Sequence, residues 1–137
     1  MRVQSIVAIV AFTLASGAAA ARTSEAGISA DAPCWKSGTT VDIVNCFAAS
    51  GKQSDADLNR TYTQIMSVLE VADRKRLQKA ERAWVAYRDA ACAAEYGLWG
   101  GGTGGPPAQL ACIDGKTRHH VDYLRTTYRL RLQRLGL

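Results

Sequence analysis

The sequence predicts a small all-α bundle of three main amphipathic helices, stapled by disulfides. Apolar residues recur at steps of three and four along three separate segments, and this spacing places side chains on one face of a helix. No stretch of useful length alternates with the period of two that is typical of a strand. Three amphipathic helices must bury their apolar faces against one another, which favours a bundle. With 137 residues the chain has room for one domain.

The N-terminal segment has the pattern of a cleaved export signal. Arg2 gives a positive end, Ile6 to Leu14 form a short apolar run, and small residues with Ala-x-Ala sites follow up to Ala21. A membrane-spanning helix needs roughly 20 apolar residues, about twice the length of this run. The expected divisions are a signal peptide at 1–21, a flexible leader at 22–33 and a helical domain at 34–137. We therefore expect a periplasmic or secreted protein with no stable membrane anchor after cleavage.

Four cysteines lie in the expected mature chain, at Cys34, Cys46, Cys92 and Cys112. An even number of cysteines in a short exported chain is typical of a disulfide framework. Four cysteines allow three connectivities. We favour neighbour pairing, Cys34–Cys46 with Cys92–Cys112, because each pair flanks or enters a helix end. No Cys-x-x-Cys occurs, and we expect neither a metal site nor a cofactor.

Gly38-Thr39-Thr40 is the start signal of the first helix, with Thr40 or Thr39 as its cap, and the helical pattern continues to Leu69. Its apolar stripe consists of Val44, Phe47, Leu58, Tyr62, Ile65 and Leu69. Gly51 and Asp55 occupy two positions of this stripe. One long helix is favoured over two helices broken near Gly51, because a glycine costs only about 1 kcal/mol inside a helix.

The second helix is expected from about Asp73 to Glu95 or Tyr96, since no Gly or Pro interrupts this segment. Its predicted core-facing stripe is Leu77, Ala80, Trp84, Tyr87, Ala91, Ala94 and Leu98. Arg88 and Asp89 lie beside the stripe, where a guanidinium needs a partner. We expect Arg88 to pair with a carboxylate of the first helix, such as Asp55 or Asp57.

Six glycines and two prolines in residues 97–107 predict an irregular loop. The third helix is expected to start near Pro107, with proline in its first turn. Its apolar face is Leu110, Ile113, Thr117, Val121, Leu124, Tyr128 and Leu135, with Gly115 as a weak point.

Positive charge gathers in the third helix. From Lys116 onward there are six basic residues against Asp122 alone. This pattern is typical of a solvated helix face whose cations suit the C-terminal end of the helix dipole. It also fits an anion-facing surface. Because nucleic acid is not an expected partner of an exported protein, the alternative targets are anionic envelope polymers or an acidic patch on a protein.

Catalysis is not expected. A hydrolase needs a nucleophile, a base and a group that orients the base. No serine or cysteine has a candidate base nearby in the sequence, and bridged cysteines leave no thiolate.

Two motifs resemble those of a known family. The segment from Asp55 to Tyr62 is similar to its Asp-x-x-Leu-Asn-x-x-Tyr motif, with Leu58 and Asn59 in place. The segment from Ala80 to Cys92 resembles its Gln-x-x-Trp-x-x-(Tyr/Phe)-Arg-Asp-x-x-Cys signature, and the positions that match are Trp84, Arg88 and Asp89. These are features of the LprI-like lysozyme-inhibitor family, and the likeness extends from Cys34 to about Leu124. This chain has His120 where the family usually places an arginine.

The resemblance implies an exported, disulfide-stapled helical protein that binds a protein partner, such as a lysozyme-type glycosidase that cleaves peptidoglycan. The alternative is an envelope protein that binds an anionic glycopolymer through its basic third helix, or a purely structural domain. For inhibition, the candidate contact residues are Trp99, Gly101 and Gly102 in the loop, with Lys116 and Arg118 expected nearby. Trp99 either folds back to cap the bundle or anchors an inserting loop.

Overall fold

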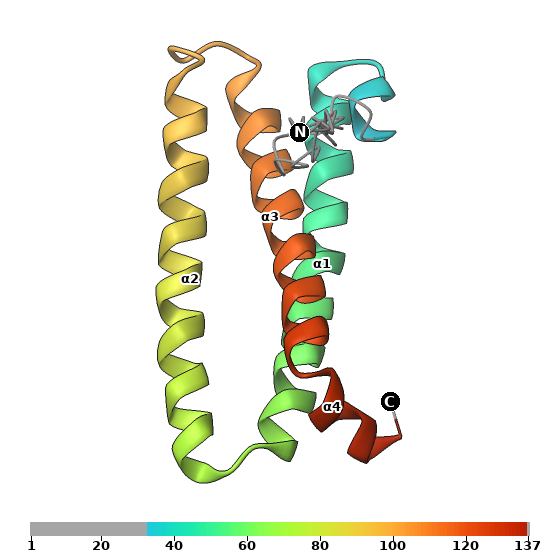
Figure 1. Cartoon of the computed structure of the whole chain (residues 1–137). Coiled ribbons are helices and arrows are strands. Elements are labelled where there is room, and N and C mark those ends of the chain that lie inside the picture. The colour runs from blue at the N-terminus through green and yellow to red at the C-terminus, as the bar shows by residue number, and fades with distance from the viewer. Residues whose placement is uncertain (1–32, 137) are drawn as a thin grey trace, which may run out of the picture.

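A computed structural model describes residues 33–136, and the expected signal peptide and all but the last residue of the leader lie outside them. The elements are η1 (Pro33–Lys36), α1 (Thr40–Val68), α2 (Val71–Gly97), α3 (Gly105–Thr127), α4 (Arg129–Leu132) and η2 (Gln133–Leu135) (Figure 1). Over this part of the chain there are helices and no strands, which confirms the predicted all-α bundle. No helix between residues 33 and 136 has the length and hydropathy needed to cross a bilayer.

Helix α1 is continuous over 29 residues, so the prediction of one long helix is confirmed. A capping box fixes its start. The Asp42 N–H donates to the Thr39 hydroxyl, and the Asp42 carboxylate accepts from the Thr39 N–H at 3.0 Å. Gly51 lies within the helix, where nothing surrounds the position that its missing Cβ would occupy. The glycine weakens the helix locally without breaking it.

Helix α3 is the centre of the bundle. It packs along both α1 and α2, whereas α1 and α2 approach each other closely at almost no point (Figure 1). This position explains why α3 buries more residues than either neighbour, including the polar residues Asp114, Thr117 and His120. The bundle is therefore two helix pairs that share α3.

The core consists of two apolar clusters. The larger one contains Leu58, Ile65, Leu69, Leu77, Val121, Leu124 and Leu132. The smaller one, near the start of α1, contains Cys34, Phe47 and Ala111, and Trp35 packs its ring edge-on against Phe47 at 5.1 Å. Between them lie buried polar groups of α1 and α3, including Ser54 and Asp114.

The predicted core-facing stripe of α2 is wrong at four of its seven positions. Tyr87 is 62% exposed and Leu98 is 86% exposed, and Ala80 and Ala94 are exposed as well. The line that faces α3 instead runs through Leu77, Glu81, Trp84, Arg88 and Cys92, which follow one another at steps of four, three, four and four. The sequence pattern missed this line because two of its positions carry charged side chains that are buried through hydrogen bonds.

Three predicted boundaries are also corrected. Helix α2 begins at Val71 with Glu70 as its N-cap, not at Asp73. Helix α3 begins at Gly105, so Pro106 and Pro107 occupy its first turn and the loop is shorter than residues 97–107. Proline is tolerated there because the first N–H groups of a helix have no partner within it. At the other end, Tyr128 separates α3 from the short α4.

Both disulfides tie the same end of the bundle. Cys34 pairs with Cys46, and Cys92 pairs with Cys112, with Cα atoms 5.5 Å and 5.6 Å apart, which confirms the neighbour pairing. Because α1 and α3 start at this end and α2 finishes there, the two bridges hold η1 to α1 and α2 to α3 (Figure 1). The α1–α2 turn and α4 lie at the opposite end.

Candidate functional site

Arg88 joins all three long helices. Its Nη1 donates to the hydroxyl of Thr117 on α3 at 3.1 Å and lies 3.4 Å from Asp55 on α1, while Nε donates to its neighbour Asp89 at 2.9 Å. The Arg88 side chain is 12% exposed, whereas both carboxylates are more than half exposed. The expected pairing with Asp55 is thus present, and the interaction with Thr117 was not anticipated.

A buried aromatic and charged cluster lies one turn away. The rings of Trp84 and His120 stack with their centroids 3.8 Å apart and 8° between their planes. His120 Nε2 donates to the Glu81 carboxylate, whose two oxygens are both 3.0 Å away. The carboxylate can only accept, so Nε2 carries the proton. The Glu81 side chain is only 14% exposed, so its carboxylate needs such a partner. The one sequence signal was His120, at the position where the family usually places an arginine.

A groove of about 410 Å³ lies between α1 and α2, where these helices diverge. Its walls are Leu58, Asn59 and Tyr62 from α1 and Gln78, Glu81, Arg82 and Val85 from α2. Of the predicted signature residues, Asn59 is exposed along this groove and Leu58 lies in the core beneath it.

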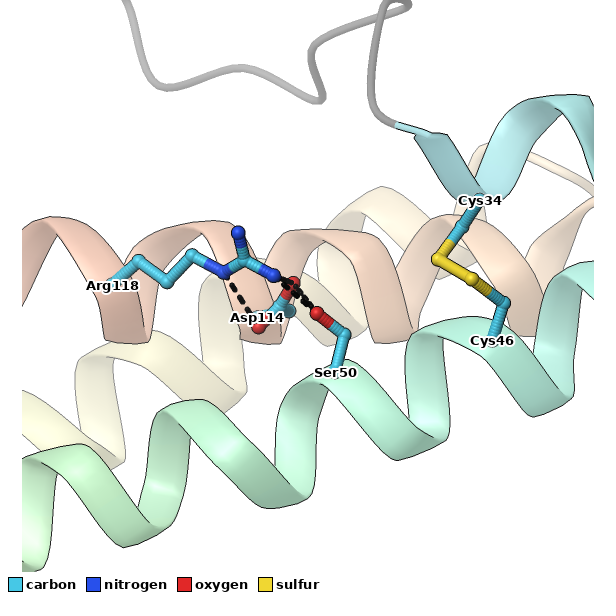
Figure 2. Close-up of a disulfide and its surroundings, with 5 residues drawn as sticks. All are labelled: Cys34, Cys46, Ser50, Asp114 and Arg118. Carbon is cyan, nitrogen blue, oxygen red and sulfur yellow. Dashed lines mark hydrogen bonds and ion pairs between the residues drawn. A yellow bond between two sulfur atoms is a disulfide. The ribbon is translucent and has the colours of Figure 1, made fainter.

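Ser50, Asp114 and Arg118 form a polar link between α1 and α3 (Figure 2). The Ser50 hydroxyl donates to Asp114 Oδ2 at 2.8 Å, Arg118 Nε donates to Asp114 Oδ1 at 3.1 Å, and Arg118 Nη2 also donates to Ser50. The Asp114 side chain is 7% exposed, so this link supplies the partners that a buried carboxylate requires. Arg118 therefore has a structural contact already.

The loop between α2 and α3 presents apolar side chains at the disulfide-tied end. Leu98 is 86% exposed and Trp99 is 49% exposed. The Trp99 ring lies directly against Gly104, where any side chain would collide with it. Trp99 thus folds back over Gly104 on one face and leaves its other face open.

Consecutive turns order this loop. The Trp99 N–H donates to Tyr96 at 3.1 Å, the Gly102 N–H donates to Trp99 at 2.8 Å, and the Gly105 N–H donates to Gly102 at 3.1 Å. Gly101 has a φ of 81°, a conformation that a residue with a Cβ rarely adopts. The bridge from Cys92 to Cys112 closes the segment at its base.

The five predicted contact residues do not form one site. Trp99, Gly101 and Gly102 lie in the loop, but Lys116 is 11 residues after the start of α3, or about 16 Å along the helix. Lys116 Nζ sits 5.5 Å from the centre of the Tyr87 ring, on the α2 side, and Arg118 turns to α1. The expectation that these two cations lie beside the loop is therefore wrong.

No three His, Cys, Asp or Glu side chains within residues 33–136 are grouped closely enough to hold a metal ion. Among the described residues, the arrangement offers structural ion pairs, open grooves and an apolar loop.

Comparison with known proteins agrees with the motifs. The family model described as lysozyme inhibitor LprI matches residues 32–124. The chain belongs to the LprI family. It is also similar to an uncharacterized protein of Rhizobium meliloti (strain 1021), with 27% identity over 105 residues that cover 67% of this chain and 76% of the relative. No solved structure matches.

The signature residues of the LprI family lie where the three long helices meet. Trp84, Arg88 and Asp89 on α2 meet Asp55 on α1 and Thr117 on α3, directly or through one another. These contacts hold the helices together. The Arg88 side chain is 12% exposed, whereas Asp55 and Asp89 are more than half exposed. The family name supports a module resembling lysozyme inhibitors, and the accessible surfaces are where a protein partner has to bind.

Proposed function

We propose that this protein acts outside the cytoplasm, where it binds a lysozyme-type glycosidase that cleaves peptidoglycan and blocks its cleft with the loop that follows α2. The observation that carries the proposal is the adjacent pair Leu98 and Trp99, exposed at the disulfide-tied end of the bundle. Two disulfides are typical of proteins that work in an oxidising compartment.

The shape and chemistry of the loop suit a cleft. Glycosidases place two carboxylic side chains on either side of the bond that they cleave, within a groove that admits a sugar chain. The open face of Trp99, with the exposed Leu98 beside it, can pack into such a groove. Aromatic anchors dominate the energetics of many interfaces. The glycines leave room for a partner's backbone to approach Trp99 closely.

Pre-organisation supports the same role. The turns of the loop and the Cys92–Cys112 bridge restrict its conformations before it meets a partner. Less conformational entropy is then lost on binding, and more of the contact energy remains as affinity.

The distribution of charge is also favourable. The chain has a formal net charge of +5, which would repel a basic lysozyme. No charged side chain occurs in residues 96–113, so the loop and the first turns of α3 are neutral. The arginines of α4 lie at the opposite end of the bundle (Figure 1). A partner that meets the loop end is therefore kept away from most of the positive charge.

Competition for the cleft tests this proposal. The mature, disulfide-bonded protein is titrated into a lysozyme with and without a soluble N-acetylglucosamine oligomer that occupies the cleft. We expect the oligomer to weaken the complex in proportion to its occupancy. A complex of unchanged affinity on a saturated cleft would place the contact elsewhere on the glycosidase.

A further inference from the structure

A second groove lies at the end of the bundle opposite the loop. It has a volume of about 400 Å³ and is lined by Gln64 of α1, Arg125 and Thr126 of α3, and Arg129 and Leu132 of α4. It is separate from the α1–α2 groove and from the loop, and nothing in the proposed inhibition uses it.

Within residues 33–136, neither arginine of this groove forms an ion pair within 4.0 Å, although Arg125 also borders a smaller pocket with Asp57 and Asp122. Across the described residues, ion pairs within 4.0 Å involve Arg60, Arg76, Arg88, Arg118 and His120, and neither Arg125 nor Arg129 is among them. Arg125 on α3 and Arg129 on α4 both line this groove, and like charges that share a groove repel each other. Both are exposed. An anion from outside would relieve this repulsion.

The groove is built on a fixed support. Leu132 is 8% exposed and belongs to the larger apolar cluster, so α4 is docked against the bundle. The Tyr128 N–H donates to Leu124 and the Leu132 N–H donates to Tyr128, each at 3.0 Å, which carries the chain from α3 into α4 without a loose linker. The positions of Arg125 and Arg129 are therefore set by the core.

The side chains indicate the kind of ligand. Guanidinium groups match the oxygens of a phosphate, and the Thr126 hydroxyl and Gln64 amide add neutral donors. Next to Arg129, Leu130 is 72% exposed. Arginines that alternate with an exposed leucine are typical of surfaces that contact the headgroup region of a membrane.

We propose that this groove binds the phosphate of an anionic phospholipid headgroup, with Leu130 in contact with the bilayer interface. The contact is peripheral. Because α3 has 23 residues, the loop would stand about 35 Å from the bound headgroup, with Trp99 directed away from the membrane. A protein held in this way presents its loop to enzymes that approach from outside the bilayer.

Vesicle co-sedimentation tests the site. The mature, disulfide-bonded protein is mixed with vesicles of phosphatidylcholine that contain phosphatidylglycerol, and with vesicles of phosphatidylcholine alone. We expect the protein to bind the anionic vesicles. Arg125→Gln/Arg129→Gln should lower the affinity for these vesicles on the order of 10- to 30-fold, since each basic residue at an anionic surface raises the affinity about fivefold. The matched control is Lys75→Gln/Lys79→Gln, which removes the same charge at the same spacing on α2. The affinity of this control variant for the anionic vesicles should fall by less than about threefold.

Further arms separate the alternatives. Leu130→Ser should weaken vesicle binding and leave binding of soluble poly(glycerol phosphate) unchanged. Equal losses in the two double variants would show general electrostatic attraction and overturn the site. Failure to bind anionic vesicles, or equal binding to neutral ones, would overturn it as well. Arginine-dependent binding of the soluble polymer without vesicle binding would contradict the assignment to a lipid. All four substituted cations are exposed, so circular dichroism should show unchanged helicity.

Discussion

The guanidinium of Arg88 donates a hydrogen bond to the hydroxyl of Thr117, which is fully buried on the central helix, at 3.1 Å. The same nitrogen reaches Asp55 on α1. Since α1 and α2 have few direct contacts, this side chain is one of the links between them. The strongest motif of the LprI signature is therefore explained by helix assembly.

Replacing Arg88 by alanine should lower the free energy of unfolding by about 2 kcal/mol, because the Thr117 hydroxyl is left buried without a partner. The paired carboxylates contribute less, since both are more than half exposed. Chemical denaturation followed by circular dichroism measures the change. Thr117→Val in the Arg88→Ala background should recover part of the loss.

The control is Arg76→Ala. Arg76 pairs with Asp73 on the surface of α2, with a side chain that is 77% exposed. We expect a change below about 0.5 kcal/mol. If Arg88→Ala changed the free energy of unfolding as little as Arg76→Ala, the contacts of Arg88 would not be what holds the helices together.

Much of the fold was predictable from the spacing of apolar residues, because α1 and α3 bury the positions that a helical period of 3.6 selects. The disulfide pairing was also predictable, because each cysteine pair flanks or enters a helix end. Helix α2 was harder, since its buried face contains Glu81 and Arg88. Whether a charged residue is buried depends on a partner from another helix, here His120 or Thr117. Such a partner is not visible within one segment.

The site was less predictable for a related reason. Trp99 and the loop glycines were singled out because their residue types are distinctive, and their role in binding stays a prediction. The positions of Lys116 and Arg118 depend on the direction in which α3 leaves the loop. They also depend on which neighbouring helix each face of α3 contacts. The groove at Arg125 and Arg129 depends on α4, a four-residue helix too short to leave a periodic pattern.

The Cys92–Cys112 bridge should contribute about 3 kcal/mol, because it closes a chain separation of 20 residues in the unfolded state. Cys92→Ala/Cys112→Ala should lower the free energy of unfolding by about this amount and loosen the loop. Peptide mapping of the protein under non-reducing conditions should recover the two neighbour pairs. Free thiols at Cys92 and Cys112 in the exported protein would refute the framework.

Two helical glycines offer stabilising changes. Gly51 and Gly115 lie inside α1 and α3, and no atom is within 4 Å of the position that a Cβ would take at either. Alanine at each should raise the free energy of unfolding by up to about 1 kcal/mol. The contrast is Gly101→Ala, where a φ of 81° strains any other residue. Thermal melts of the three variants distinguish these cases. A higher melting temperature for Gly101→Ala would contradict the loop geometry.

The capping box at the start of α1 makes Asp42 sensitive to pH. Hydrogen bonds from the Thr39 hydroxyl and N–H lower the pKa of the Asp42 carboxyl from its ordinary value. Because the pKa is lower in the folded state, the ionised Asp42 carboxylate contributes fully to the free energy of unfolding above the unfolded-state pKa. This contribution is lost as the pH falls through the folded-state pKa. NMR titration should find the pKa of Asp42 below the ordinary aspartate value, and Thr39→Ala, which removes the hydroxyl and keeps the N–H, should reduce the difference. An unshifted Asp42 would refute the cap.

The most direct test of the proposed function is the inhibition of a lysozyme's lytic activity by the mature, oxidised protein and by its Trp99→Ala variant. We expect inhibition by the unsubstituted protein and at least a tenfold weakening with Trp99→Ala, which corresponds to about 1.4 kcal/mol, at unchanged helicity. Tyr87→Ala removes another exposed aromatic from α2, away from the loop, and should leave inhibition intact. Absence of inhibition by the unsubstituted protein would contradict the account. So would inhibition that survives Trp99→Ala and vanishes when Arg125 and Arg129 are replaced.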